Sequence, residues 1–393
     1  MKSFTNCNSS GIKIESYFVN ALSANNQSSA NVVIGHVLNI LTLEPDSKII
    51  LLVTSSSPLL KNLSEHLLLR RIRIIIVNSI FARSTLLRIL YEQLVLPLLI
   101  PSNTLLFSVS GYFIFLKKGY QVTLIQNPIP FLPSDITNDF SSSIYLKTLL
   151  LAFRLSAQFT SSQRYLAFNS RHIELLAQKS LRLNHSFTRT LLLYNPVPSI
   201  PEHIINNLPE LSPRTAFVAV GPIIAYKQAH LIFQAFIDFY HNVSSSFELI
   251  YIGKPCNTSY YESIKSDLDN YPGIPIKTIT DYLPDSELQD ILRSSFAYIS
   301  MSLYESFGLP AIEAQRYGAP SLLLHGTAGP EIASRGCISI ASSSALSLRE
   351  AMASLVDNPS LWNELSNQAI QNSRKYCSPY ITAPLMRLSN CSS

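Results

Sequence analysis

The N-terminal half of the chain alternates short apolar runs with longer segments in which apolar residues recur every three or four positions. The runs predict strands of a parallel sheet, and the periodic segments predict helices that cover both faces of that sheet. The expected strands are residues 14–19, 49–53, 72–77, 105–109, 122–125, 165–168 and 190–194. The expected helices lie near 30–42, 58–69, 83–96, 142–160 and 171–180.

The C-terminal half repeats this alternation more clearly. Its expected strands are 216–220, 247–252, 276–279, 296–301 and 321–324, and its expected helices are 228–241, 260–268, 286–294, 345–357 and 359–376. The pattern is that of a doubly wound, nucleotide-binding domain, but it lacks the Gly-x-Gly-x-x-Gly of a dinucleotide fold. That absence counts against a dehydrogenase.

A proline-rich run from 196 to 213 separates the two halves and predicts a linker. We therefore expect a first Rossmann-like domain over 1–198 and a second over 199–376. A tail of residues 377–393 is expected to pack back on the first domain. The length of 393 residues fits two domains better than one hydrophobic core.

The chain is unusually poor in charge. Charged residues make up 14% of it and hydrophobic residues 47%, against about 25% charged residues in a typical soluble protein. This predicts a large core and allows for a surface that rests on a membrane. The net charge of +5 is mild, and no dense Lys/Arg run occurs, so nucleic acid is not an expected partner.

The cysteines, at 7, 256, 337, 377 and 391, are scattered and contain no Cys-x-x-Cys pair. They predict reduced thiols in a cytoplasmic protein.

No apolar run precedes Ser9 and Ser10, so no secretory signal is expected. The most apolar window, 85–115, contains Arg88, Glu92 and two prolines and is no expected membrane span. His-Glu-x-x-His does not occur, and no histidine has metal-ligand spacing, so no metal cofactor is indicated.

The most informative stretch is Tyr-Glu-Ser-Phe-Gly-Leu-Pro-Ala-Ile-Glu at 304–313. It follows an expected buried strand, and Gly308 can take backbone conformations that other residues avoid. Pro310 suits the first turn of a helix, which Gly318 and Pro320 would end. The backbone N–H groups of the loop and of the helix start would then point at one place, where a phosphate can bind.

Glu305 and Glu313 flank this expected anion site. Carboxylates beside a diphosphate are best used to accept hydrogen bonds from sugar hydroxyls. A ligand with hydroxyls on both sides of a diphosphate is a nucleotide sugar. The spacing of the two glutamates alone would fit better an exposed loop followed by a helix whose N-terminal Glu favours the macrodipole.

The segment from Glu305 to Glu313, together with Gly-Ala-Pro at 318–320 and Gly-Pro-Glu-Ile at 329–332, resembles the donor-site signature of the family 4 retaining glycosyltransferases. The resemblance implies the α/β GT-B fold, in which two Rossmann-like, doubly wound domains face each other across a cleft. The second domain would bind the nucleotide sugar and the first the acceptor. The implied reaction transfers a hexose to an acceptor hydroxyl with retention at the anomeric carbon.

The resemblance also implies roles for individual residues. Glu305 and Lys227 would be catalytic, Glu305 by orienting the donor sugar and Lys227 by stabilising the leaving diphosphate. Glu313 would hold the ribose hydroxyls. Further donor-binding positions are Phe307, Gly308, Leu309, Gly221, Lys254, Tyr282 and Leu283. The nucleobase contacts at Tyr282 and Leu283 would be mainly through the main chain.

The chain departs from the family pattern at two places. Pro222 stands where the family has an arginine, and Lys254 on the next loop is a candidate substitute. Ser28 and Ser29 stand where the family has a glycine-rich loop. Their hydroxyls could hydrogen-bond the sugar, or they could simply cap a helix. His325 follows a strand near the same crevice, but a lone histidine is more often structural.

Gln126 and Asn127 follow a strand at the edge where α/β folds bind ligands. We expect them to bind the acceptor or the sugar rather than to transfer protons, although a proline-rich turn would explain them too. Residues 83–97 resemble a helix of the family's acceptor domain. That helix is expected either at a cleft or membrane surface, or as an ordinary packing helix. Lys147, Arg154, Arg164 and Arg171 are candidates for anionic groups of an acceptor or a lipid, or for a solvated helix face.

The expected partners are a nucleotide-sugar donor, a surface-polysaccharide or lipid-linked glycan acceptor, and a peripheral contact with the inner face of a membrane. Two alternatives stay open. One is a catalytically degenerate GT-B protein that only binds a sugar nucleotide, which the two departures favour. The other is a GT-B nucleotide-sugar epimerase or hydrolase, against which Gln126 and the sparse histidines argue.

Overall fold

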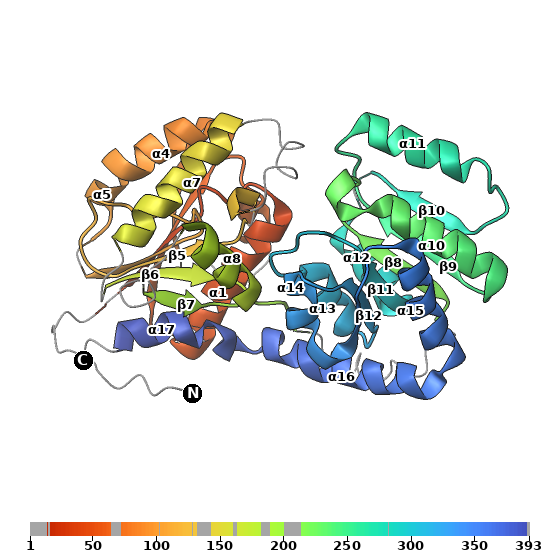
Figure 1. The fold of residues 1–393 in the computed structure, drawn as a ribbon. Coiled ribbons are helices and arrows are strands. Elements are labelled where there is room, and N and C mark those ends of the chain that lie inside the picture. Colours follow the sequence, from red (N-terminus) through yellow and green to blue (C-terminus); the bar gives the residue numbers. More distant parts are fainter. Residues whose placement is uncertain are drawn as a thin grey trace. The chain divides into compact units, whose positions relative to one another are not determined.

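The computed structural model describes residues 14, 16–63, 72–101, 103–127, 129–131, 143–159, 163–181, 189–199, 214–281 and 283–390. The chain divides into two compact units (Figure 1). The N-terminal unit contains Met1–Val197 and Ser378–Ser393, and the C-terminal unit contains Pro198–Cys377. The last residues of the chain therefore belong to the same unit as the first.

The N-terminal unit is built on a seven-stranded parallel sheet in the order β3-β2-β1-β4-β5-β6-β7. The chain builds the sheet outward from β1 to β3 and then continues from β4 on the other side of β1. Residues of β1, β4 and β5 are almost all buried, which explains their apolar runs. The strands are β1 (Ser16–Asn20), β2 (Lys48–Thr54), β3 (Arg73–Val77), β4 (Thr104–Ser108), β5 (Gln121–Ile125), β6 (Arg164–Phe168) and β7 (Thr190–Leu192).

Helices cover both faces of this sheet. They are α1 (Gln27–Leu43), α2 (Leu59–Leu63), α3 (Ile80–Arg83), α4 (Thr85–Leu94), α5 (Leu96–Leu99), α7 (Ser143–Gln158), α8 (Arg171–Leu181) and α17 (Ala383–Asn390), with 3-10 turns η2 (Ile129–Phe131) and η6 (Pro379–Thr382). The C-terminal η6 packs on α1, where His36 Nδ1 lies 3.0 Å from Thr382 Oγ1. Burial lowers the pKa of His36 to about 3, so its ring is neutral in this contact.

The C-terminal unit has a six-stranded parallel sheet in the order β10-β9-β8-β11-β12-β13. Its strands are β8 (Ala216–Val220), β9 (Glu248–Ile252), β10 (Ile276–Ile279), β11 (Ser295–Ser300), β12 (Ser321–Leu324) and β13 (Cys337–Ile340). The direction of winding reverses between β8 and β11, which are neighbours in the sheet. In sheets of this type, ligands bind outside the carboxyl ends of the two strands at such a reversal.

The helices of the C-terminal unit are α10 (Ala229–Asn242), α11 (Thr258–Leu268), α12 (Asp285–Ser294), α13 (Leu309–Gln315), α14 (Ala328–Ala333), α15 (Ala345–Asp357) and α16 (Pro359–Cys377), with 3-10 turns η4 (Ala225–Lys227) and η5 (Ser334–Gly336). The core on one face of the sheet is aromatic. Phe217 packs edge-on against both Phe236 and Phe239 of α10, with ring centroids 6.4 and 5.4 Å apart.

Two sequence predictions are corrected by the structure. The helix expected over 83–97 is three short helices, because Ser84 is extended and caps α4 by accepting a hydrogen bond from the backbone N–H of Leu87. Strand β13 had not been expected, since its run is only four residues long and Ile340 alone among them is fully buried. The other described strands begin and end within two residues of their predicted ranges. Across the described ranges, no helix is both long and apolar enough to span a bilayer.

Candidate functional site

The loops that follow β8 and β11 meet at the winding reversal of the C-terminal sheet. The backbone N–H of Leu303, after β11, donates a 2.9 Å hydrogen bond to the carbonyl of Tyr226, after β8. This contact fixes the two loops against each other at the carboxyl edge. The side chains that they carry therefore share one place.

The two predicted catalytic side chains form an ion pair there. Lys227 Nζ lies 2.7 Å from Glu305 Oε2, and the two side chains are only 15% and 21% exposed. Burial by itself would lower the pKa of Lys227, but the carboxylate of Glu305 and the hydroxyl of Tyr226 outweigh it and raise that pKa. The lysine is thus held as a cation at the reversal, where an anionic group of a ligand would compete with Glu305 for it.

The loop that carries Glu305 is fixed from several sides. Gly308 has φ 84°, a left-handed conformation that favours glycine, and it caps α13. Phe307 is buried and packs edge-on against Tyr376 of α16, with ring centroids 5.4 Å apart. The backbone N–H of Ala328 donates to the carbonyl of Glu305. A loop held in this way keeps its backbone and the Glu305 side chain in place before any ligand arrives.

Glu313 lies one turn into α13 and is half-buried. Its carboxylate makes no hydrogen bond or ion pair with any described residue. Burial raises the pKa of Glu313, and the negative charge of Asp285 adds to this effect while Arg316 opposes it. Arg316 itself is bound to the carbonyl of Pro198 and to Gln289 Oε1. The Glu313 carboxylate therefore keeps its acceptor capacity with respect to the described residues.

The loops after β8 and β9 are also in close contact. A Cβ added to Gly253 would lie 1.7 Å from the carbonyl oxygen of Gly221, so only glycine fits there. The backbone N–H of Ile223 donates a 3.0 Å hydrogen bond to the carbonyl of Lys254. The Lys254 side chain is exposed and has no partner among the described residues. The sequence did not single out Gly253, although a glycine directly after a strand was a usable signal.

We expect Gly253→Ala to lower the free energy of unfolding by about 1–3 kcal/mol, because the new methyl group forces two backbone segments apart. Donor affinity should fall with it, since the displaced loop leads to Lys227. Urea unfolding followed by circular dichroism measures the first effect. Gly273→Ala is the matched control, since a Cβ at Gly273 meets nothing within 4 Å. Equal stability of the two variants would contradict the prediction.

The remaining donor-side predictions have mixed outcomes. The half-buried side chain of Leu283 packs against the hydrophobic cluster that contains Leu292 and Tyr317. Tyr282 lies outside the described residues. His325 is exposed, and its Nδ1 lies 3.1 Å from Ser339 Oγ of β13. No three His, Cys, Asp or Glu side chains in the described part of the chain lie close enough together to hold a metal ion.

The acceptor-side predictions fall in the N-terminal unit. Gln126 and Asn127 are half-buried just after β5, and Asn127 Oδ1 accepts a 3.0 Å hydrogen bond from the backbone N–H of Ile129. Ser28 and Ser29 lie in the first turn of α1, whose N-cap is Asn26. The hydroxyl of Ser29 donates to Asn26 Oδ1 at 2.8 Å. Neither serine is the N-cap itself, which corrects the alternative interpretation of this pair.

A buried polar network that the sequence did not reveal lies at the winding reversal of the N-terminal sheet. Asn20, the last residue of β1, donates to Glu92 Oε1 at 2.7 Å and to Ser108 Oγ of β4 at 3.2 Å. The hydroxyl of Tyr112 donates to Glu92 Oε2. Burial raises the pKa of Glu92, while the hydrogen bonds from Tyr112 and Asn20 and the charge of Arg88 oppose it. The network joins α4 to the carboxyl ends of β1 and β4.

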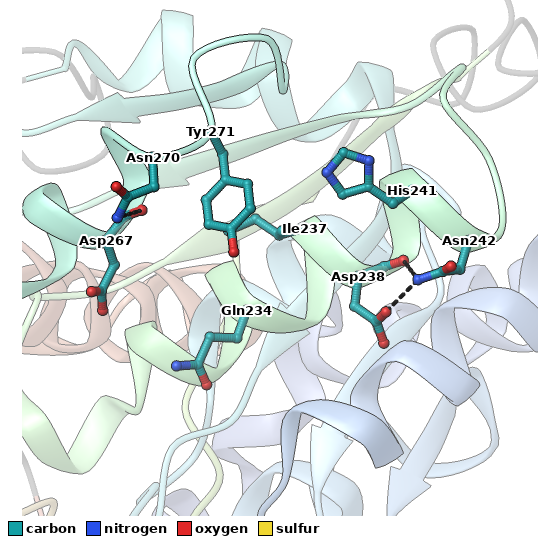
Figure 2. Close-up of a pocket in the computed structure, with 8 residues that line it drawn as sticks. All are labelled: Gln234, Ile237, Asp238, His241, Asn242, Asp267, Asn270 and Tyr271. Carbon is teal, nitrogen blue, oxygen red and sulfur yellow. Dashed lines mark hydrogen bonds between the residues drawn. The ribbon is translucent and has the colours of Figure 1, made fainter.

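Of two pockets in the C-terminal unit, one is lined by predicted site residues and the other is not. A cavity of about 10 Å³, room for one water, lies under the β11 loop and is lined in part by Glu305, Gly308 and Thr327. A larger pocket of about 500 Å³ is shown in Figure 2; its lining residues are Gln234, Ile237, Asp238, His241, Asn242, Asp267, Asn270 and Tyr271. It lies at the C-terminal ends of α10 and α11, hence at the amino edge of the sheet. We place the functional site at the opposite edge, because the ion pair and Glu313 lie there.

Lys227, Glu305 and Glu313 all lie in a stretch that matches a known family. Residues 202–376 match the family model described as Glycosyl transferases group 1. This stretch resembles a group 1 glycosyl transferase domain. Among curated proteins, none is similar enough in sequence to count as a relative.

Solved structures resemble the chain over nearly its whole length. HepE from Anabaena, in complex with UDP and glucose, is 13% identical, with a TM-score of 0.66 over 95% of this chain and 98% of that one. A glycosyltransferase from Rickettsia africae is 14% identical, with a TM-score of 0.64 over 96% and 98%. A UDP-forming α,α-trehalose-phosphate synthase from Burkholderia xenovorans is 10% identical, with a TM-score of 0.67 over 96% and 98%. These likenesses confirm the predicted fold class, GT-B with two Rossmann-like units.

Proposed function

We propose that the protein is a family 4 retaining glycosyltransferase that moves a hexose from a nucleotide sugar to a hydroxyl of a glycan acceptor. One observation carries the proposal. At the winding reversal of the unit that matches the glycosyl transferase model, the mostly buried Lys227 cation pairs with Glu305, and Glu313 on the helix that follows has no hydrogen bond or ion pair with a described residue. A cation for a diphosphate and two carboxylates for sugar hydroxyls are the groups that a nucleotide sugar requires.

In the proposed reaction, the bond from the anomeric carbon to the diphosphate breaks as the acceptor oxygen attacks the same face of the sugar. The leaving diphosphate takes the proton of the acceptor hydroxyl. Lys227 and the N–H groups of the fixed loop stabilise the charge that develops on the diphosphate. Glu305 orients the sugar, and Glu313 accepts hydrogen bonds from the ribose. The protein thus contributes positioning and charge, and no side chain needs to act as a nucleophile.

The donor to test first is a UDP-sugar, because HepE has been solved with UDP and glucose and the Burkholderia synthase is described as UDP-forming. The proposed acceptor is a surface-polysaccharide or lipid-linked glycan. We place the enzyme in the cytoplasm, where the scattered cysteines remain reduced, with a peripheral contact to the inner face of the membrane. No metal ion or other cofactor is part of the proposal.

A second candidate function is binding of a sugar nucleotide without transfer. Pro222 supports it, because this residue supplies no charge where an arginine would grip the diphosphate. Losing a charge-assisted hydrogen bond costs about 1.5–3 kcal/mol. The exposed Lys254 lies on the neighbouring loop, after β9, and is the cation that we propose offsets that loss.

Calorimetric titration with UDP-, GDP-, ADP- and dTDP-sugars tests the proposal. We expect binding of one nucleotide class, followed by slow donor hydrolysis even without acceptor, since water can replace the acceptor hydroxyl. The anomeric configuration of the released sugar, read by NMR at early times, should match that of the donor. Binding without hydrolysis would favour the second candidate, inversion would contradict retention, and the absence of any binding would overturn both.

A further inference from the structure

The pocket of about 500 Å³ at the amino edge of the C-terminal sheet takes no part in the proposed transfer. It is lined by the C-terminal half of α10, the end of α11 and the turn that follows α11 (Figure 2). Its volume falls within the range of pockets that hold small molecules, about 300–1,000 Å³. Strands β8 and β9 have five residues each. A strand of that length, about 17 Å, separates the pocket from the edge that carries Lys227 and Glu305.

Tyr271 forms the aromatic wall of this pocket. Its backbone is held on both sides, because its N–H donates to the carbonyl of Leu268 at 2.9 Å and its carbonyl accepts from the N–H of Ile274 at 3.2 Å. Its ring centroid lies 6.3 Å from that of His241, and Tyr271 is still 42% exposed. In Figure 2 the ring stands among the lining side chains, with Asp267 on one side and His241 on the other. The ring is thus in place before a ligand arrives, which lowers the cost of binding.

Polar groups around the ring keep their hydrogen-bonding capacity. The Asp267 carboxylate, the Gln234 amide and the Tyr271 hydroxyl make no hydrogen bond or ion pair with a described residue. Asn270 Nδ2 donates to the carbonyls of Ser266 and Asp267, at 3.1 and 3.3 Å, and this leaves Asn270 Oδ1 as an acceptor. The pocket therefore offers donors and acceptors together, and a ligand with hydroxyl groups can use both kinds.

The charges of the pocket argue against an ionic ligand. None of its eight lining residues, all within the described part of the chain, is Lys or Arg, so an anion would meet no cation. Asp238 is already engaged, since Arg349 Nε lies 3.4 Å from its Oδ2 and Asn242 Nδ2 donates to its Oδ1. A cationic ligand would find the single carboxylate of Asp267 and leave the amides unused. A neutral ligand with hydroxyls and an apolar C–H face would use the amides and the ring together.

We propose that this pocket binds a neutral glycan segment, as a second sugar site remote from the transfer site. The C–H face of one sugar ring lies on Tyr271, and its hydroxyls bond to Asp267, Gln234 and Asn270. The binding stands on the C-terminal unit alone. Its purpose rests on the proposed function, because a glycan acceptor that is held at a second site stays at a high effective concentration near the enzyme.

Saturation-transfer NMR titrations of the full chain, without donor, test the pocket. The probes are three neutral hexasaccharides, namely maltohexaose, cellohexaose and β-1,4-mannohexaose. We expect binding of at least one of them. Tyr271→Ala should raise its dissociation constant by about tenfold or more, since it removes apolar area that the sugar would cover. Asp267→Ala should raise it by about tenfold, the effect of losing one hydrogen bond to a charged group. Both side chains are exposed, so both variants should fold.

The matched control is Tyr380→Ala, which removes a tyrosine of η6 that is 71% exposed and lies in the N-terminal unit. It should bind the hexasaccharide like the original chain. No binding of any of the three probes, or equal binding by Tyr271→Ala, would overturn the proposal. So would binding of spermidine that Asp267→Ala and high salt both abolish, because the pocket would then be a cation site. Calorimetric titration with UDP-sugars should be unchanged in Tyr271→Ala. A failure of the second sugar site and a failure of the proposed function are therefore distinguishable.

Discussion

Lys227→Ala is expected to lower kcat/KM for transfer by about 100- to 1,000-fold, the usual cost of removing one donor that stabilises transition-state charge. The lysine lies at the winding reversal, and its pKa is raised, so it is charged at neutral pH. Its removal leaves Glu305, now without a cation, close to where the diphosphate would lie. Steady-state transfer assays with the donor identified by titration measure the loss.

The partner substitution separates the two roles. Glu305→Ala should mainly lower kcat, because it removes the group that orients the sugar while leaving Lys227 free for the diphosphate. In the variant that carries both substitutions, the increase in activation free energy should be smaller than the sum of the increases in the two single variants, because the two residues are in direct contact. The control is Lys277→Ala, which removes an exposed lysine of β10 and should leave kcat and KM unchanged. Wild-type turnover in Lys227→Ala would remove the lysine from the proposed site.

Glu313→Ala is expected to raise the dissociation constant of the nucleotide sugar by about 100-fold, which corresponds to losing one or two charge-assisted hydrogen bonds. Burial raises the pKa of Glu313 in the free protein, so its carboxylate takes up a proton at a higher pH than an ordinary Glu. Affinity should therefore be constant well above that pKa and fall as the pH drops through it. Calorimetry over a pH series measures both effects.

Glu313→Gln separates charge from shape, because the amide keeps the size of the side chain but does not titrate. This variant should bind the donor weakly at every pH, and its affinity should not fall further as the pH is lowered. Glu364→Ala, an exposed carboxylate on α16, should keep the affinity and the pH profile of the original chain. A pH profile that persists in Glu313→Gln would assign the titration to another group.

Much of the fold could be predicted because parallel strands buried on both faces leave a strong signature. The runs at 216–220 and 321–324 were located to the residue. The site loop was recognisable because Gly308 has the left-handed backbone that favours glycine and Pro310 lies in the first turn of α13, a position that suits proline. That Glu305 pairs with Lys227 was not predicted, since it depends on the neighbouring positions of β8 and β11, which are far apart in sequence.

Other features could not be predicted, for physical reasons. The pattern of α4 shows that the helix has an apolar face and a polar face, but not which of them turns inward. That choice depends on Asn20, Ser108 and Tyr112, which the fold brings beneath the helix. The close approach of Gly253 to Gly221 likewise exists only once β8 and β9 are paired.

The return of the chain to the N-terminal unit after Cys377 has a consequence for how the protein is made. Domains usually fold in the order of synthesis, the N-terminal one first. Here the first unit is interrupted after Val197, and the segment that packs on α1, with Thr382 against His36, leaves the ribosome after the C-terminal unit. The C-terminal unit is thus an insertion that can fold while the first unit still lacks its last elements. Synthesis of the N-terminal unit therefore begins before that of the C-terminal unit and is completed after it.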